Sequence, residues 1–256
     1  MKILALDTAT ENCSVALLVG DRLVTREAEM QRGHAERILP MVQEVLAEAG
    51  LALEQLDAIA FGRGPGGFTG VRLCASVTQG LAFGAGVPVV PVSDLAAVAQ
   101  RVFEARSPSS HELAPAGTPQ RVLVCNDARM REVYWACFER GPDGLAVAVG
   151  EEHVGPSDSV ALPASWVMPA SASAVGPTPG QVASAPSGAG RGFAAYPELN
   201  DRLKAALGTI DSTPLPRATE ILRLAIPLFQ SGYTLAPELA IPTYLRNDVA
   251  KPKSPG

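Results

Sequence analysis

The fold is decided at the amino terminus by residues 2–28, KILALDTATENCSVALLVGDRLVTREA. The apolar run from Lys2 to Asp7 ends in a carboxylate, and a second apolar run covers Cys13 to Val19. Gly20-Asp21 is a typical hairpin turn, after which Arg22 to Ala28 alternates as a third strand. The sequence therefore predicts a sheet that opens with three consecutive strands.

Helices and strands alternate after this hairpin. Apolar residues at spacings of three and four predict a helix up to Ala49, kinked or begun at Pro40 and stopped by Gly50. The next predicted elements are a strand over 57–62, a helix ending near Gly84, a strand over 87–92 and a helix from the Ser93 cap to about Arg106. This order is typical of an α/β lobe.

The second half repeats the opening. Strands are predicted over 121–126, 132–139 and 145–152, followed by a helix over 219–230 and an extended tail over 242–253. A segment rich in Pro, Ala, Ser and Gly occupies about 155–190. We expect a first lobe over 1–106, a linker over 107–119 and a second lobe over 120–256, whose last helix and tail are candidates to return to the first lobe.

Composition narrows the function classes. The 256 residues are 47% hydrophobic with a formal net charge of −5, and neither a membrane-length apolar segment nor a signal peptide is evident. The four cysteines form no CxxC pair, so we expect buried, reduced thiols in a cytoplasmic protein. Without a basic cluster, strong independent RNA binding is not expected.

Two loops could hold phosphate. Asp7-Thr8-Ala9-Thr10 follows the first strand, where a carboxylate and hydroxyls can bind metal-bound water, although the same residues also cap turns. Gly64-Pro65-Gly66-Gly67-Phe68-Thr69-Gly70-Val71-Arg72 leads into a helix, and is either an anion site or a tight turn. It is neither a Walker A loop nor a GxSxG elbow. Gly188-Ala189-Gly190-Arg191-Gly192 could line an adenosine site.

The helices of the first lobe carry a candidate partner surface. Ser76, Gly80 and Gly84 recur every four residues, and small residues let another helix approach closely. Met41 is predicted on the outer side of the preceding helix, and an exposed methionine favours a partner surface. Among the three histidines no HxxxH or HExxH pair occurs, so no metal site is predicted. His34 is expected to cap or pack the start of its helix.

These segments resemble the TsaB (YeaZ) family, accessory proteins of tRNA threonylcarbamoyladenosine (t6A) synthesis. The resemblance is carried by residues 3–17, His34 to Pro40, Gly64 to Arg72, residues 127–134, and Tyr244-Leu245-Arg246 with Val249-Ala250. The family motif residues are His34, Gly64, Pro65, Gly66, Phe68, Thr69, Gly70 and Arg72.

The resemblance implies an actin-like ATPase (Hsp70- and sugar-kinase-like) fold of two related lobes, each a mixed sheet with helices. It also implies a TsaD-type paralogue that transfers threonylcarbamoyl to adenosine 37 of tRNA, the pathway ATPase TsaE, and contact with tRNA only through the complex. The first-lobe helices would form the contact with TsaD, or a homodimer, through Leu39, Met41, Leu46, Val71, Ala75, Thr78 and Ala82. On this basis we expect Met41→Glu or Ala75→Trp to abolish partner binding without unfolding the chain.

The chain departs from an active ATP-using member of the fold. Ala9 stands where a phosphate-loop glycine is usual, and Asn126-Asp127-Ala128-Arg129 has none either. The histidine pair of the catalytic paralogue is missing. We therefore predict a non-catalytic subunit without a cofactor, in which Asp7, Thr8, Thr10, Gly188 and Gly190 are a vestigial nucleotide site that could retain weak binding. An active ATP-dependent phosphotransferase is the alternative, and a peptidase a remote one.

Overall fold

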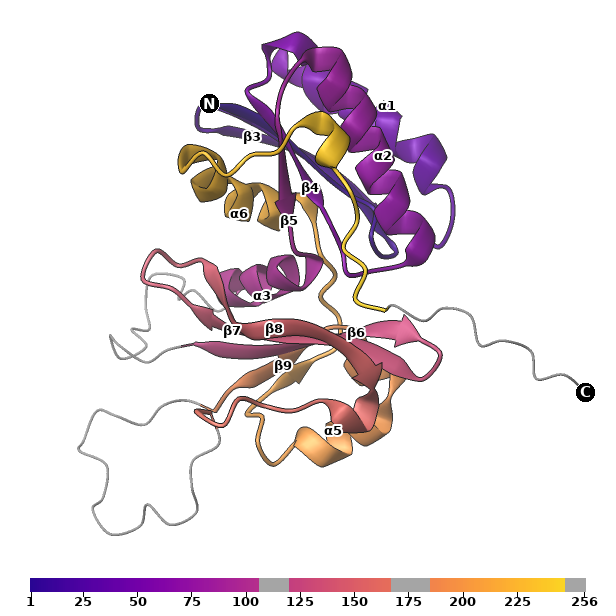
Figure 1. The fold of residues 1–256 in the computed structure, drawn as a ribbon, viewed down its shortest axis with the longest axis vertical. Coiled ribbons are helices and arrows are strands. Elements are labelled where there is room, and N and C mark those ends of the chain that lie inside the picture. The colour runs from indigo at the N-terminus through magenta and orange to yellow at the C-terminus, as the bar shows by residue number, and fades with distance from the viewer. Residues whose placement is uncertain (106–119, 167–184, 247–256) are drawn as a thin grey trace, which may run out of the picture.

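The computed structural model describes residues 1–105, 120–166 and 185–246, which form two stacked lobes (Figure 1). Each lobe is built on a five-stranded mixed sheet. The predicted linker at 107–119, much of the predicted 155–190 segment and Val249-Ala250 lie outside the described residues.

The first sheet has the strand order β3-β2-β1-β4-β5. Its strands are β1 (Lys2–Asp7), β2 (Asn12–Val19), β3 (Arg22–Glu29), β4 (Ala58–Gly62) and β5 (Val89–Val92). The first three pair antiparallel, as the hairpin turn at Gly20 predicts, while β4 and β5 continue parallel to β1. Gly20 takes a φ of 61°, which a glycine adopts without the steric cost of a side chain.

The second sheet has the order β10-β9-β6-β7-β8. Its strands are β6 (Arg121–Arg129), β7 (Glu132–Arg140), β8 (Ala146–Pro156), β9 (Ser187–Ala189) and β10 (Ile210–Asp211). Read from β8, it repeats the first sheet, because three antiparallel strands are again followed by two parallel ones. The predicted fold class, two related α/β lobes of the actin-like kind, is confirmed.

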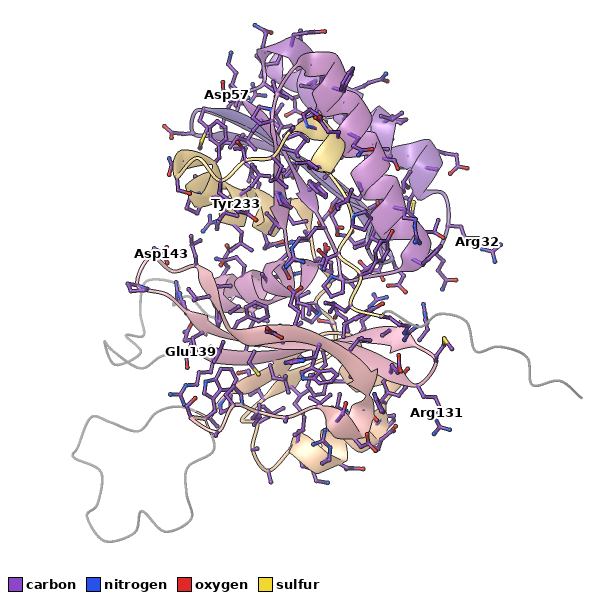
Figure 2. All side chains as sticks on the ribbon, in the orientation of Figure 1. Arg32, Asp57, Arg131, Glu139, Asp143 and Tyr233 are labelled. Carbon is purple, nitrogen blue, oxygen red and sulfur yellow. The ribbon has the colours of Figure 1, made fainter. Side chains whose placement is uncertain are left out.

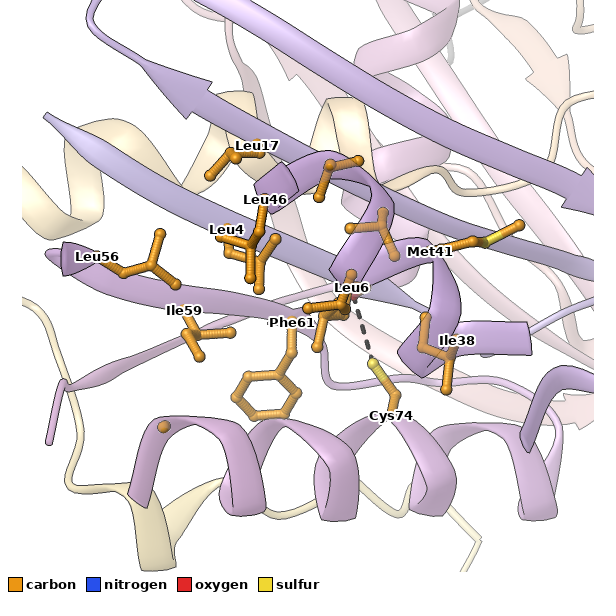
Figure 3. Packing of buried hydrophobic residues seen from close by; sticks show 14 of the residues in the cluster. Leu4, Leu6, Leu17, Ile38, Met41, Leu46, Leu56, Ile59, Phe61 and Cys74 are labelled. Atoms are coloured by element: carbon orange, nitrogen blue, oxygen red, sulfur yellow. Dashed lines mark hydrogen bonds between the residues drawn. The ribbon is translucent and has the colours of Figure 1, made fainter. Parts of the chain in front are cut away.

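Helices cover both faces of the first sheet. The helices α1 (His34–Ala49) and α2 (Phe68–Ala85) pack on one face and α6 (Ala218–Gln230) on the other (Figure 1). Alternate residues of β1 divide between the two cores: Leu4 and Leu6 face α1 and α2 (Figure 3), whereas Ile3 joins the cluster containing Ile221 of α6. The first lobe is thus completed by a helix from the far end of the chain.

The helix α3 (Asp94–Ala105) lies between the lobes (Figure 1). Its Leu95 and Val98 are fully buried in a cluster with Val124 of β6 and Phe138 of β7. Ser93 caps it as the sequence predicts, because its hydroxyl oxygen accepts the N–H of Ala96 at 3.2 Å. The helix that ends the first sequence half therefore packs on the sheet of the second.

The segment after α6 lies against the first lobe. Leu235 pairs with Val89 at the edge of β5, and Ala240 is buried in the core beneath α1 and α2. Further on, the guanidinium of Arg63 donates to the hydroxyl of Thr243 at 2.6 Å. The chain therefore crosses from the second sheet back to the first and ends its described part beside the junction of the lobes.

The short elements of the second lobe escaped the sequence analysis. These are α4 (Gly192–Ala195), α5 (Pro197–Leu203) and the 3-10 turn η2 (Ser157–Ser159), together with η1 (Leu53–Gln55) in the first lobe and η3 (Pro237–Leu239), which contacts α2. Each is too short for its periodicity to stand out. The four cysteines are free and buried, as predicted. No helix within the described ranges has the length and apolarity needed to cross a membrane.

Candidate functional site

The glycine-rich segment lies directly on the loop that follows β1. The N–H of Gly67 donates to the carbonyl of Ala9 at 2.7 Å, and the hydroxyl of Thr8 donates to the carbonyl of Gly70 at 2.7 Å. A Cβ at Gly66 would lie 2.6 Å from the oxygen of Ala9, and one at Gly70 only 2.1 Å from that of Thr8. These glycines are required because two backbone segments approach each other closely.

The loop is buried and most of its polar groups bond within the chain, although Oδ2 of Asp7 has no hydrogen-bond partner. Asp7, Thr8 and Ala9 are at most 1% exposed, and the N–H of Ala9 donates to Oδ1 of Asp7 at 2.8 Å. The imidazole Nε2 of His34 lies 2.9 Å from the carbonyl of Thr10, so His34 joins the start of α1 to the same loop. The loop that the sequence left open as either a vestigial phosphate site or a capped turn is therefore a buried junction between α1, α2 and β1.

Two carboxyl groups meet beneath this junction. Asp7 ends β1 and Asp94 begins α3, and both are fully buried. Asp94 accepts the N–H of Gly64, which links α3 to the glycine-rich segment. A Cβ at Gly62 would lie 2.4 Å from Asp94 Oδ1 and 2.8 Å from Asp7 Oδ1, so the strand between them must carry a glycine. The sequence analysis missed Asp94, because an aspartate in the first turn of a helix is common and does not by itself indicate a site.

Burial sets the protonation of this pair. Loss of solvation raises the pKa of Asp7 to about 7, against hydrogen bonds to the carboxylate that lower it. Loss of solvation and the adjacent charge of Asp7 raise the pKa of Asp94 well above its ordinary value. Since two neighbouring carboxylates cannot both ionise at low cost, the pair shares a proton near neutral pH. Within the described ranges, no group of three or more His, Cys, Asp or Glu could hold a metal ion.

The glycines predicted to line an adenosine site instead pack against β6. Gly190 has a φ of 102°, and a Cβ there would lie 2.5 Å from the carbonyl of Cys125. A Cβ at Gly188 would lie 2.8 Å from the ring of Phe193, and one at Gly192 2.8 Å from the Cys125 oxygen. Close packing within the second lobe is therefore sufficient to explain why glycine occupies all three positions.

Ion pairs join the loops of the two lobes. The carboxylate of Glu11 lies 3.5 Å from the guanidinium of Arg129 and 3.3 Å from that of Arg191, and Arg191 also pairs with Glu29. Arg129 pairs in addition with Asp127 at 2.9 Å. Arg129 and Arg191 are therefore already matched by carboxylates of the same chain. Sequence reasoning missed this network, because its members are far apart along the chain.

The predicted partner residues are mostly inside the first lobe. Leu39 is exposed (44%), but the other six are buried: Met41, Leu46, Val71, Ala75, Thr78 and Ala82. The prediction that Met41 is exposed is wrong, because α1 lies against β2 and β3 as well as α2, and Met41 faces Cys13 of β2. Met41→Glu and Ala75→Trp would therefore disrupt the core. Weaker partner binding by either variant could follow from unfolding alone and would not identify the binding surface.

The exposed side of α2 is its stripe of small residues. Ser76, Gly80 and Gly84 are exposed, and a Cβ at either glycine would meet no atom within 4 Å. Phe83 beside them is 77% exposed. We call the surface formed by these four residues and Leu39 of α1 the helix face. The glycines leave room for close packing by another helix, at a cost to helix propensity. The exposed Phe83 beside them offers apolar surface to bury.

The comparisons with known proteins agree with this architecture. Residues 27–253 match the family model described as "TsaD: tRNA N6-adenosine threonylcarbamoyltransferase". The chain is 39% identical over 262 residues to the tRNA threonylcarbamoyladenosine biosynthesis protein TsaB of Escherichia coli, covering 100% of this chain and 99% of the relative. The corresponding TsaB of Haemophilus influenzae is 38% identical, with 100% and 98% covered. This chain belongs to the TsaB family.

Solved structures of related proteins are also similar to this chain. The structure described as "YeaZ from Pseudomonas aeruginosa" superposes with a TM-score of 0.75 at 38% identity, covering 95% of this chain and 99% of that one. Another, of an uncharacterized protein "with similarity to peptidase YEAZ" from the same organism, gives a TM-score of 0.77 at 39% identity, with 96% and 99% covered. Membership of the TsaB family is confirmed along nearly the whole chain.

Substitution of two glycines in α2 tests how the glycine-rich segment is seated. Gly70→Ala should lower the free energy of unfolding by about 1–3 kcal/mol, because the new Cβ meets the Thr8 carbonyl. Gly80→Ala is the matched control and should raise it by roughly 0.5–1 kcal/mol, since its Cβ enters open space in a helix interior. Urea unfolding measures both. Equal effects of the two variants would contradict the close approach of the two loops.

The carboxyl pair predicts a dependence of stability on pH. Because the folded pKa values exceed the ordinary 3.8, the folded state binds protons more tightly, and stability should fall as pH rises from about 4 through about 7. The slope approaches about 1.4 kcal/mol per pH unit for each proton released. Asp94→Asn should flatten it, whereas Asp21→Asn in the exposed β2–β3 turn should not. Unfolding midpoints that show the same slope in wild type and Asp94→Asn would exclude the pair as its source.

Proposed function

We propose that this chain is a non-catalytic subunit that binds a TsaD-type protein and supports its transfer of threonylcarbamoyl to tRNA. The observation that carries the proposal is the seating of the glycine-rich segment on the β1–β2 loop, with the Gly67 N–H on the Ala9 carbonyl. That contact places protein backbone against the loop that would have to accept phosphate. The curated relatives named for t6A biosynthesis supply the pathway.

The chemistry of the loops argues against catalysis by the chain itself. Phosphate binding at a loop requires free N–H groups, yet that of Ala9 is bonded to Asp7 and that of Gly67 to Ala9. On the second lobe, Arg129 and Arg191 are paired with Glu11. A nucleotide would have to displace these internal partners. We therefore propose that the chain uses no cofactor and is neither an ATPase nor a peptidase.

The helix face supports a helical partner. Helix axes usually pack 8–10 Å apart, and glycines at the contact allow the nearer part of that range. Gly80 and Gly84 provide such a place, Phe83 is an exposed apolar side chain of the same helix, and Leu39 is another on α1, which contacts α2. A related lobe presents related helices, so a TsaD-type protein is the partner that this surface fits. A homodimer would use the same face and would therefore compete with the heterodimer.

Variants at exposed positions of the helix face test the proposal. Gly80→Trp should fill the close contact and Leu39→Glu should place a charge in it, and each should weaken binding of the TsaD-type protein at least tenfold, or about 1.4 kcal/mol. Both positions are exposed, so unfolding midpoints should stay near that of the wild type. Val147→Glu changes an exposed valine (52%) on β8 of the other lobe and is the matched control.

Isothermal titration of the TsaD-type protein into each variant gives the dissociation constants. Wild-type affinity in both Gly80→Trp and Leu39→Glu would exclude the helix face as the binding surface. Weakened binding in Val147→Glu as well would mean that the effect is not specific to the first lobe.

A further inference from the structure

Three segments that are distant in sequence meet at the side of the molecule where the lobes join. They are the start of α2, the extended segment before Arg246, and the turn between β6 and β7, all at the right of Figure 1. Their side chains form a surface that we call the arginine–aromatic strip, made of Phe68, Arg72, Tyr244, Arg246, Met130 and Arg131. Phe68 and Arg72 belong to the glycine-rich segment, but the side chains of the strip take no part in its contact with the β1–β2 loop or in the carboxyl pair.

Stacking joins the aromatic end of the strip. The guanidinium carbon of Arg72 lies 3.2 Å from the ring centroid of Phe68 and 4.8 Å from that of Tyr244. Both rings are largely exposed, Phe68 by 62% and Tyr244 by 50%. A planar guanidinium held against rings keeps N–H donors directed to its edges. Arg72 also donates to the carbonyl of Phe68 in its own helix at 3.2 Å, which helps to fix the guanidinium in place.

The other end of the strip is a firmly held turn. Arg246 donates to the carbonyl of Ala128 at 3.2 Å, pairs with Glu132, and lies 3.6 Å from the sulfur of Met130. Met130 is nevertheless 73% exposed. Arg131 projects outward at the edge of the molecule (Figure 2). In the described part of the chain, neither Arg72 nor Arg131 forms an ion pair with a carboxylate, so the strip offers two uncompensated cations.

The backbone of this turn points to a role beyond connection. Arg129, Met130 and Arg131 have φ values of 61°, 54° and 65°, a left-handed conformation that disfavours residues with side chains. Two-residue hairpin turns of this kind are usually Asn-Gly or Asp-Gly. Anchors on both sides hold the turn, since Asp127 accepts the N–H of Arg129 at 2.8 Å and Arg246 bonds Ala128. Unfavourable backbone that the surroundings enforce is typical of functional positions.

We propose that the arginine–aromatic strip binds single-stranded RNA, with bases on Phe68 and Tyr244 and phosphates on Arg72 and Arg131. The inference rests on the proposed function, which supplies tRNA as the substrate of the complex, and gives this chain a direct contact where only an indirect one was expected. Exposed aromatic rings beside free arginines fit unpaired bases and their phosphates. An acidic peptide would match the cations but has no need of the two stacked rings.

The net charge of the chain fits a contact made within a complex. A formal charge of −5 gives the isolated chain little attraction for RNA, so two arginines and two rings can add to RNA affinity but not supply it alone. The strip begins at the first turn of α2, whose exposed middle and end carry the helix face. A partner bound on the helix face would therefore have the strip beside it.

RNA binding by the reconstituted heterodimer tests the inference. The probe is an unmodified tRNA anticodon stem-loop, and the variants are Arg72→Ala with Tyr244→Ala, and Arg131→Ala. We expect the double variant to raise the dissociation constant at least tenfold. The dependence of log affinity on log salt should fall by about 0.7 for each phosphate that the variant no longer binds. Arg223→Ala, which removes an arginine from the far face of the first lobe, is the matched control and should change neither quantity.

Binding of the TsaD-type protein is measured on the same variants, so that the two proposals can fail separately. Unchanged RNA affinity in intact heterodimers of the strip variants overturns the inference while the proposed function stands. Failure of the strip variants to form the heterodimer, while Arg223→Ala still forms it, also overturns the inference and assigns the strip to protein binding. If the wild type forms no heterodimer, the proposed function fails. In that case ultraviolet cross-linking of the isolated chain to the stem-loop at low salt tests the strip. We expect cross-links at Phe68 or Tyr244, and cross-links only elsewhere would overturn the inference.

Discussion

The rest of the structure depends on the close contact between two backbone segments, the loop after β1 and the glycine-rich start of α2. Hydrogen bonds hold the two segments together, and at Gly66 and Gly70 their separation leaves no room for a side chain. His34 fastens α1 to the same loop, and Asp94 fastens α3 from below. Since α3 packs on the second sheet, this one contact orients the helix face, the junction of the lobes and the second lobe together.

We propose that the same contact distinguishes this chain from a nucleotide-using member of its fold. Contacts within the chain occupy the loops that would hold phosphate. The Ala9 N–H donates to Asp7 and its carbonyl accepts the Gly67 N–H, while Glu11 pairs with Arg129 and Arg191. What the first lobe leaves exposed is a stripe of glycines with apolar neighbours, a surface suited to another helix. We propose that the two-lobed architecture serves here to hold surfaces for partners.

The sequence allowed the fold to be predicted well, because β1 to β3, α1 and α6 have strong periodicity and clear turns. It could not place individual side chains around a helix with the same accuracy. The pattern of α1 puts Met41 outside the apolar stripe, whereas the helix contacts β2, β3 and α2 and buries it. Asp94, Arg191 and Tyr244 acquire their surroundings from residues far away in the chain, and no local pattern indicates such contacts. The glycines between Gly64 and Gly70 indicate a close approach, but only the structure identifies protein backbone as what approaches.

The most direct test of the proposed function is t6A formation on unmodified tRNA, followed by mass spectrometry of nucleosides, in a reaction with threonylcarbamoyl-adenylate, a TsaD-type protein and the pathway ATPase. The reaction is run with and without this chain, and with Gly80→Trp in its place. We predict product with the wild type, and little product without the chain or with the variant. Equal product in all three reactions would contradict the proposal that the chain supports catalysis by its partner.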